Sequence, residues 1–206
     1  SLIQMTYETL FSEEPYTTFK DYFDVYVVLA VSEREKISEN IALGTIYSGE
    51  GYGIDYDKVE TYARKVPALN DGITNNTHVL VLLNDKSYYR ASCGYCSYGS
   101  IACSNIRLED DNMAKTIKHE TLGHGIARLG DEYVEVVEPG MENPFAGNFP
   151  KEAWQNIWDE HQLGFRLNVD VTNDPTKIVW KDFLSNNDYV NEVGIYEGAL
   201  LYEKGA

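Results

Sequence analysis

The sequence predicts an α/β fold in which a mixed, mostly parallel sheet packs on helices. Residues 25–31 and His78–Leu83 are continuous runs of aliphatic and β-branched residues, which are typical of strands covered on both faces. Between these runs, residues 57–66 repeat apolar side chains at helical spacing. A strand, a helix and a second strand in this order are the usual unit of a parallel sheet.

The rest of the chain predicts further elements around this unit. In chain order they are helices over 2–11, 110–129 and 151–161, an irregular connection or short strand pair over 87–104, and segments of uncertain type at 169–171 and 177–184. The acidic residues Glu109, Asp110 and Asp111 favour the start of the long helix, since negative charge stabilises a helix N-terminus. Gly130 is a natural end for it. No repeat or linker divides the chain, so residues 1–206 are expected to form a single domain.

Composition excludes several classes of protein. The chain has 206 residues, of which 43% are hydrophobic, so it can form a substantial core. It carries 17 basic and 33 acidic residues, and the net charge of −16 disfavours binding to nucleic acid or to anionic membranes. The longest apolar run, residues 25–31, is far shorter than the roughly 20 residues of a membrane-spanning helix. No signal peptide is present after Ser1, so a leader is either absent or already removed.

Three cysteines, Cys93, Cys96 and Cys103, lie within eleven residues of one another. An odd number leaves at least one thiol outside any internal disulfide. The alternatives are a bridge from Cys93 or Cys96 to Cys103, buried thiols, or a three-thiolate metal site, for which no histidine follows nearby. A bridge would indicate an extracytoplasmic protein.

The strongest functional signal is the string KHETLGHGIARLGDEY at residues 118–133. In the H-E-x-x-H zinc motif the histidines are four residues apart, about 40° around an α-helix, whereas His119 and His124 are five apart, about 140°. Either these histidines are unrelated residues on a surface helix, or a π-bulge returns both rings to one face. Gly123 and Gly125 favour the bulge because glycine lets the backbone distort easily, and Glu120 keeps the general-base position. A retained fold with an inactive site is a further alternative.

HETLGHGIARLGDEY resembles the signature of the IgA-peptidase family of bacterial zinc metallopeptidases. The segments SEEPYTTFKDYFDVYVVLAVS and VGIYEGALLYEKG are also similar to recurring segments of that family. The H-E-x-x-G-H spacing is similar to that of dipeptidyl peptidase III as well, but the Asp-Glu-Tyr triplet that follows favours the first family. The resemblance implies a metzincin-like fold with a zinc-binding active-site helix and a single catalytic domain over 1–206. It also implies a methionine-containing segment that follows this chain.

The resemblance further implies one catalytic Zn²⁺ held by His119, His124 and Asp131, with Glu120 as the general base that activates the metal-bound water. Asp131 follows His124 by seven residues, and Gly130 before it can turn the chain back towards the metal. Glu132 is the competing third ligand. Neighbouring side chains in an extended segment point to opposite sides, so only one of the two acidic residues is expected to face the metal.

The expected function is that of a secreted, periplasmic or cell-surface endopeptidase acting on extracellular proteins or peptides, with host glycoproteins among the candidates. The alternative is a non-catalytic surface module that binds glycans or host proteins, suggested by the tyrosines Tyr88, Tyr89, Tyr95 and Tyr98. The other histidines, His78 and His161, are interpreted as core or capping residues. The glycine-rich residues 48–53 lack the Lys-Ser/Thr ending of a phosphate loop and are expected to form a turn.

Overall fold

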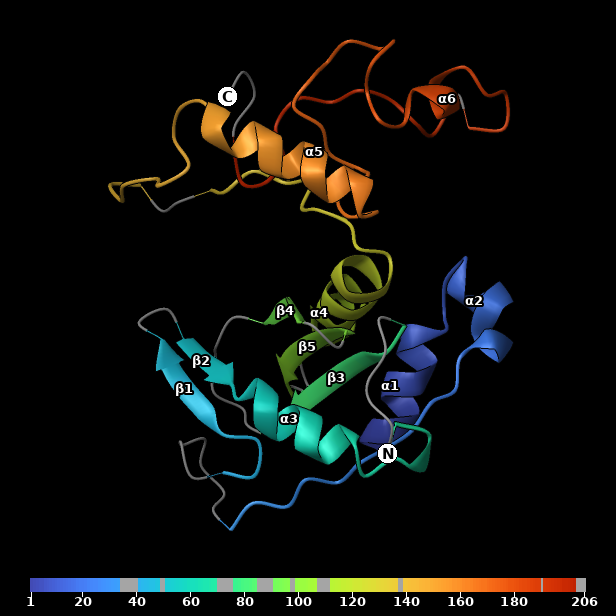
Figure 1. The fold of residues 1–206 in the computed structure, drawn as a ribbon, viewed down its shortest axis with the longest axis vertical. Coiled ribbons are helices and arrows are strands. Elements are labelled where there is room, and N and C mark those ends of the chain that lie inside the picture. The colour runs from blue at the N-terminus through green and yellow to red at the C-terminus, as the bar shows by residue number, and fades with distance from the viewer. Residues whose placement is uncertain are drawn as a thin grey trace. The chain divides into compact units, whose positions relative to one another are not determined.

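The computed structural model describes residues 1–33, 41–48, 51–69, 76–84, 91–96, 99–106, 112–136, 139–189 and 191–202. The chain forms two compact units, Ser1–Ala127 and Arg128–Ala206, here called unit 1 and unit 2 (Figure 1). Each unit is described by itself. The organisation as a single catalytic domain stays a prediction.

Unit 1 combines a small mixed sheet with helices. Its elements are α1 (Leu2–Leu10), α2 (Tyr16–Phe19), η1 (Lys20–Tyr22), β1 (Thr45–Ser48), β2 (Gly51–Ile54), α3 (Tyr56–Ala63), η2 (Pro67–Leu69), β3 (His78–Leu83), β4 (Ser92–Cys96), β5 (Gly99–Asn105), α4 (Asn112–Ile117) and η3 (Lys118–Ile126). The main sheet has the order β3-β5-β4, with β3 parallel and β4 antiparallel to β5. β1 and β2 form a separate antiparallel pair. The α/β class is therefore observed, but one of the two pairings in the main sheet is antiparallel.

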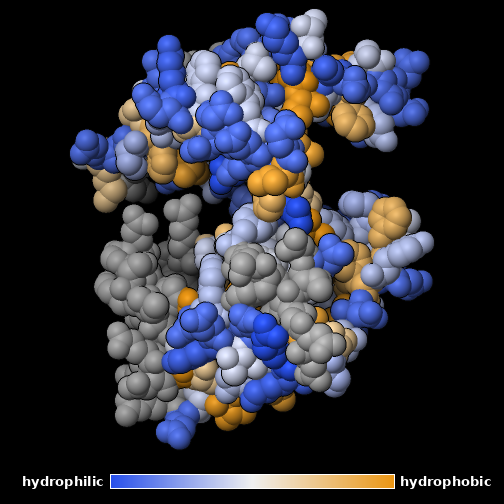
Figure 2. All heavy atoms as spheres, viewed as in Figure 1, coloured by the Kyte–Doolittle hydropathy of each residue, from blue (hydrophilic) through white to orange (hydrophobic). Residues whose placement is uncertain are grey.

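Helices cover both faces of the main sheet. Val81 of β3 and Ile101 of β5 pack with Val59 of α3 on one face. Leu80 and Leu82, which alternate with them along β3, pack on the other face in the cluster that contains Ile117 of α4. This alternation follows from the two-residue period of a strand. Figure 1 shows the strands between α3 and α4, and Figure 2 shows mainly hydrophilic side chains on the outer side of α3.

The strand predicted at 25–31 is wrong. These residues have no regular secondary structure, and Val27 and Leu29 are 55% and 76% exposed. Within the described parts of the chain, no strand pairs with them. Apolar and β-branched residues favour an extended backbone, but a strand also needs a neighbour that accepts and donates its backbone hydrogen bonds. His78–Leu83 has such a neighbour in β5, and its prediction as a buried strand is confirmed.

The predicted helices near 2–11 and 57–66 are confirmed as α1 and α3, and the predicted strand pair within 87–104 is confirmed as β4 and β5.

The long helix is described from Asn112 and ends at Ile126. The acidic cluster at 109–111 lies outside the described residues. The helix thus ends before Gly130, its expected end, and Arg128, with φ of 57°, adopts the left-handed conformation just after it. In unit 2, a Cβ at Gly130 would lie 3.0 Å from Cγ2 of Val169. A side chain there would push its neighbours aside, so glycine allows the close packing.

Unit 2 contains η4 (Lys151–Ala153), α5 (Trp154–Gln162) and α6 (Lys181–Leu184), joined by long turns. Its buried apolar side chains include Ile157, Val169 and Ile178. Residues 131–136 form no helix, and Val134 forms a parallel bridge with Leu201. In the described part of the chain, every helix is too short or too polar to cross a bilayer.

Candidate metal site

The string with the two spaced histidines forms a π-helix. α4 continues directly into η3, and the N–H of Ala127 donates to the carbonyl of Leu122 over 2.9 Å, a bond between residues five apart. A π-helix has more residues per turn than an α-helix, so residues five apart come closer to the same face. The predicted π distortion between His119 and His124 is confirmed.

The π geometry brings the two imidazoles together. Nε2 of His119 lies 3.0 Å from Nε2 of His124, and the ring centroids are 4.5 Å apart. Two nitrogens bound at about 2.0–2.1 Å to one tetrahedral zinc ion would be about 3.3 Å apart. The spacing also allows a hydrogen bond between the rings when one nitrogen carries a proton. The observed geometry fits a shared divalent cation with only a small adjustment of the side chains.

Glu120 completes the cluster. The ligand atoms of His119, Glu120 and His124 all lie within 4.8 Å of one another, and among the described residues no other group of three histidine, cysteine or acidic side chains does so. His119 is exposed and His124 half-buried, whereas Glu120 is only 8% exposed. The cluster can therefore be reached from solvent while its carboxylate is held inside the protein.

Hydroxyl groups from three other elements donate to carbonyls of η3. Tyr16 of α2 donates to Leu122 over 2.9 Å. Tyr95 of β4 donates to His124, and Ser100 of β5 to Gly125 over 3.0 Å. Sequence reasoning missed all three contacts, because the residues next to a tyrosine or serine do not indicate a hydrogen bond to a distant part of the chain. Burial raises the pKa of the Tyr16 phenol, which keeps it a donor.

His78, the first residue of β3, contacts Ser100, the residue that donates to Gly125. Its Nδ1 is 2.8 Å from Oγ of Ser100, and since that hydroxyl donates to Gly125, the ring must donate from Nδ1. Burial lowers the pKa of His78 from 6.5 to about 4, so the ring is neutral at neutral pH. His78 is outside the metal cluster, in agreement with its interpretation as a core histidine. His161 in unit 2 similarly places Nε2 2.9 Å from the carbonyl of Val169.

The two glycines of η3 differ in their surroundings. A Cβ at Gly125 would lie 2.2 Å from Cε1 of His78, whereas a Cβ at Gly123 would have Lys118 O, 4.0 Å away, as its nearest neighbour. The sequence predicts that both glycines ease the distortion of the backbone. In the structure, Gly125 is the position where only glycine fits, because the ring of His78 packs directly on the helix backbone.

The acidic residues after the helix belong to unit 2. The carboxylate of Glu132 accepts a hydrogen bond of 2.9 Å from the amide of Asn168, which also bonds the N–H and carbonyl of Gly130. Asp131 is half-buried, and its carbonyl accepts from the N–H of Leu200 over 2.8 Å. Glu132 thus has a structural partner within its own unit.

The register of β4 and β5 bears on the cysteines. Cys93 pairs with Ala102, and Ser92 pairs with Cys103. Cys93 therefore shares a face with Ala102. Because successive residues of a strand point to opposite faces, the side chains of Cys93 and Cys103 point to opposite faces of the sheet. This geometry argues against a direct bridge between those two residues. The side chain of Cys96 lies outside the described structure.

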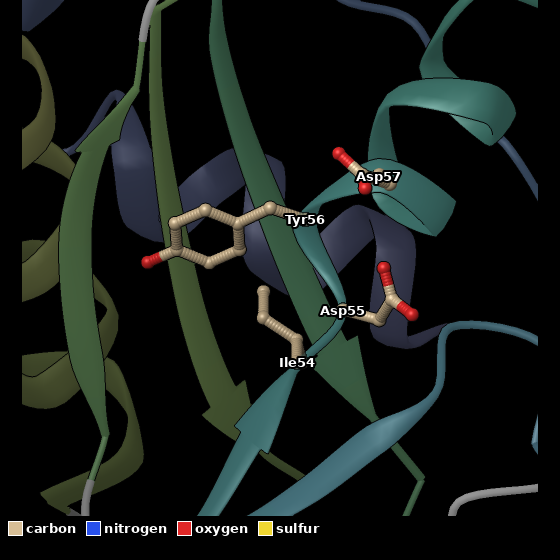
Figure 3. Close-up of a pocket in the computed structure, with 4 residues that line it drawn as sticks. All are labelled: Ile54, Asp55, Tyr56 and Asp57. Carbon is tan, nitrogen blue, oxygen red and sulfur yellow. The ribbon is translucent and has the colours of Figure 1, made fainter.

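An open depression in unit 1 is separate from the metal cluster. It is lined by Ile54, Asp55, Tyr56 and Asp57, and Figure 3 shows the tyrosine ring pointing away from the two carboxylates. Asp55 caps α3 by accepting the N–H of Lys58 over 3.1 Å. The Tyr56 ring packs against Gly94, where a Cβ would lie 2.1 Å from its hydroxyl. These roles are structural.

Comparison with known proteins identifies the family. The model of the IgA peptidase M64 family matches residues 3–190, which include both histidines and Glu120. No curated protein and no solved structure matches the chain. A match over nearly the whole chain, together with the two imidazoles that η3 brings together, leads to one conclusion. The chain belongs to the IgA peptidase M64 family of peptidases.

Proposed function

We propose that the protein is a zinc-dependent metalloendopeptidase. The observation that carries this proposal is the 3.0 Å separation of the His119 and His124 Nε2 atoms within the π-helix of a peptidase-family member. The two rings could also share a hydrogen bond when one nitrogen carries a proton, but membership of a peptidase family favours a cation shared by both nitrogens. A bound cation explains the arrangement.

His119, His124 and Asp131 would hold the zinc ion. Two imidazoles and one carboxylate leave a fourth position open, as in catalytic zinc sites generally. Asp131 is proposed from its place seven residues after His124 and from the resemblance of the motif. When bound, zinc lowers the pKa of a coordinated water and polarises the scissile carbonyl.

Glu120 is proposed as the general base. It follows the first histidine directly, and its carboxylate lies within 4.8 Å of the ligand atoms of both histidines. It would accept a proton from the attacking water and deliver it to the nitrogen of the leaving amine. Its burial supports this role, because at 8% exposure the carboxylate is shielded from bulk water.

The proposed substrates are extracellular proteins or peptides, and the proposed location is outside the cytoplasm. Both proposals come from the family resemblance. No observation favours the alternative of a glycan- or protein-binding module. Of the four tyrosines that suggested it, Tyr95 directs its hydroxyl to the carbonyl of His124, and the other three lie outside the described residues.

A peptide-library cleavage assay on the full chain tests this function. We expect cleavage that a chelator abolishes and stoichiometric zinc restores. Glu120→Gln is expected to retain zinc and lose turnover, because the residue acts as a base and is not a ligand. Glu142→Gln, at an exposed position of unit 2, is the matched control and is expected to cleave normally. Cleavage that persists without metal would contradict the proposal, and loss of zinc in Glu120→Gln would make this residue a ligand.

A further inference from the structure

Three polar residues lie in a row across the main sheet beneath the metal helix. His78 of β3 is the register partner of Ser100 of β5, and Ser100 is the register partner of Tyr95 of β4. Directly paired residues of adjacent strands point to the same face of a sheet. We call His78, Ser100 and Tyr95 the polar row. Its face is the one on which η3 lies, since Ser100 and Tyr95 both bond that helix.

The polar row bonds the backbone at and beside a candidate ligand. Tyr95 donates to the carbonyl of His124 itself, and Ser100 donates to the carbonyl of Gly125. Carbonyls in the last turn of a helix have no N–H partner within the helix. The hydroxyls of Tyr95 and Ser100, on paired strands, therefore donate hydrogen bonds to carbonyls for which η3 itself has no N–H donor.

The rest of the row fixes Ser100 in place. His78 Nδ1 lies 2.8 Å from the Ser100 hydroxyl, which can then direct its own proton only to Gly125. The serine is 6% exposed, so water does not compete for this bond. The ring of His78 also occupies the space where a side chain on Gly125 would begin.

We propose that the polar row positions the metal site, holding the end of the π-helix so that the imidazole of His124 stays within reach of the cation bound by His119. This inference rests on the proposed function. Tyr95 and Ser100 are positioning residues, because they act through the backbone of His124 and Gly125. The chemistry is that of second-layer hydrogen bonds, which orient a ligand before the metal arrives and so raise the affinity for it.

The test measures zinc affinity by competition with a chromophoric chelator on the full chain. Tyr95→Phe and Ser100→Ala each remove one hydroxyl and little volume. We expect each to weaken zinc binding about tenfold, the effect of losing one hydrogen bond to a preorganised site. Ser100→Thr keeps a hydroxyl and is expected to restore much of the affinity. Thermal unfolding of the metal-free chain, measured in parallel, is expected to change little for Tyr95→Phe.

Ser104→Ala is the matched control for a merely structural effect. Ser104 lies on the same strand, is 2% exposed, and donates over 3.3 Å to the carbonyl of Asn105, which is outside η3. Its loss is expected to lower stability without changing zinc affinity. Equal zinc affinity in wild type, Tyr95→Phe and Ser100→Ala would overturn the inference while leaving the proposed function intact.

Two further outcomes would also contradict the inference. If Tyr95→Phe lowers kcat with unchanged zinc affinity, the phenol contacts substrate and does not position the ligand. If the wild-type chain binds no zinc, the proposed function fails, and the inference fails with it.

Discussion

Gly125→Ala probes the contact between the sheet and the metal helix. The added Cβ would stand 2.2 Å from Cε1 and 2.4 Å from Nδ1 of His78, far inside normal contact distance. Either the ring or the helix must move. Overpacking of this kind typically costs about 1–3 kcal/mol. Displacing the ring also breaks its 2.8 Å contact with Ser100, which adds about 1 kcal/mol. The expected destabilisation of unit 1 is about 2–4 kcal/mol.

Gly123→Ala is the matched substitution, two residues earlier in the same helix. The nearest atom to its new Cβ would be the Lys118 carbonyl oxygen at 4.0 Å, an ordinary contact. Alanine is favoured over glycine in a helix by roughly 0.5–1 kcal/mol, so this variant is expected to be as stable as wild type or slightly more stable. The pair separates the effect of packing on the sheet from the general effect of adding a side chain.

Hydrogen exchange of the peptide covering residues 112–127 is the suitable assay. Tryptophan fluorescence reports only unit 2, because Trp154, Trp158 and Trp180 all lie there, and it serves as the internal control. Gly125→Ala should speed exchange in η3, and adding His78→Ala should restore part of the protection by vacating the space. Wild-type exchange in Gly125→Ala, or faster exchange in Gly123→Ala, would refute the packing argument.

Three further predictions concern the metal and the buried histidine. Asp131→Ala should weaken zinc binding severely while Glu132→Ala leaves it intact, as measured by chelator competition, and the reverse pattern would transfer the ligand role to Glu132. Deleting Thr121 would give His119 and His124 the four-residue spacing, yet it removes a buried side chain and the π register, so zinc binding should fall; an active deletion variant would contradict this reasoning. The pKa of His78 is lowered to about 4, so the unfolded chain binds its proton more readily between pH 6.5 and 4, and the metal-free protein should lose up to about 3 kcal/mol as the pH falls through that range. Urea unfolding at pH 7 and pH 4.5 measures this loss, which should be smaller in His78→Asn.

Much of the site could be predicted from local sequence. If His119 and His124 bind one ion, their five-residue spacing predicts a distorted helix, because no regular α-helix brings both rings together. The spacing and the distortion are both properties of one short segment. The π-helix could therefore be predicted from this segment alone, and it is observed at the predicted place.

What could not be predicted depends on partners far away in the chain. Residues 25–31 and 78–83 have similar apolar patterns, but within the described segments only the second run pairs with another strand. That pairing, and not the pattern alone, makes residues 78–83 a strand. The polar row likewise exists because register aligns His78, Ser100 and Tyr95, which are separated in sequence. The importance of Gly125 over Gly123 follows from the position of the His78 ring, which periodicity does not reveal.

The proposed chemistry requires η3 to present both imidazoles to one zinc ion. X-ray absorption at the zinc edge of the zinc-loaded full chain measures this, because multiple scattering from imidazole rings counts the histidine ligands. We expect two imidazole nitrogens at about 2.0–2.1 Å, with oxygen donors completing a four-coordinate shell. His119→Ala should lose the bound zinc. A shell with one imidazole or none, or zinc bound equally well by His119→Ala, would show that the two rings do not share a zinc ion.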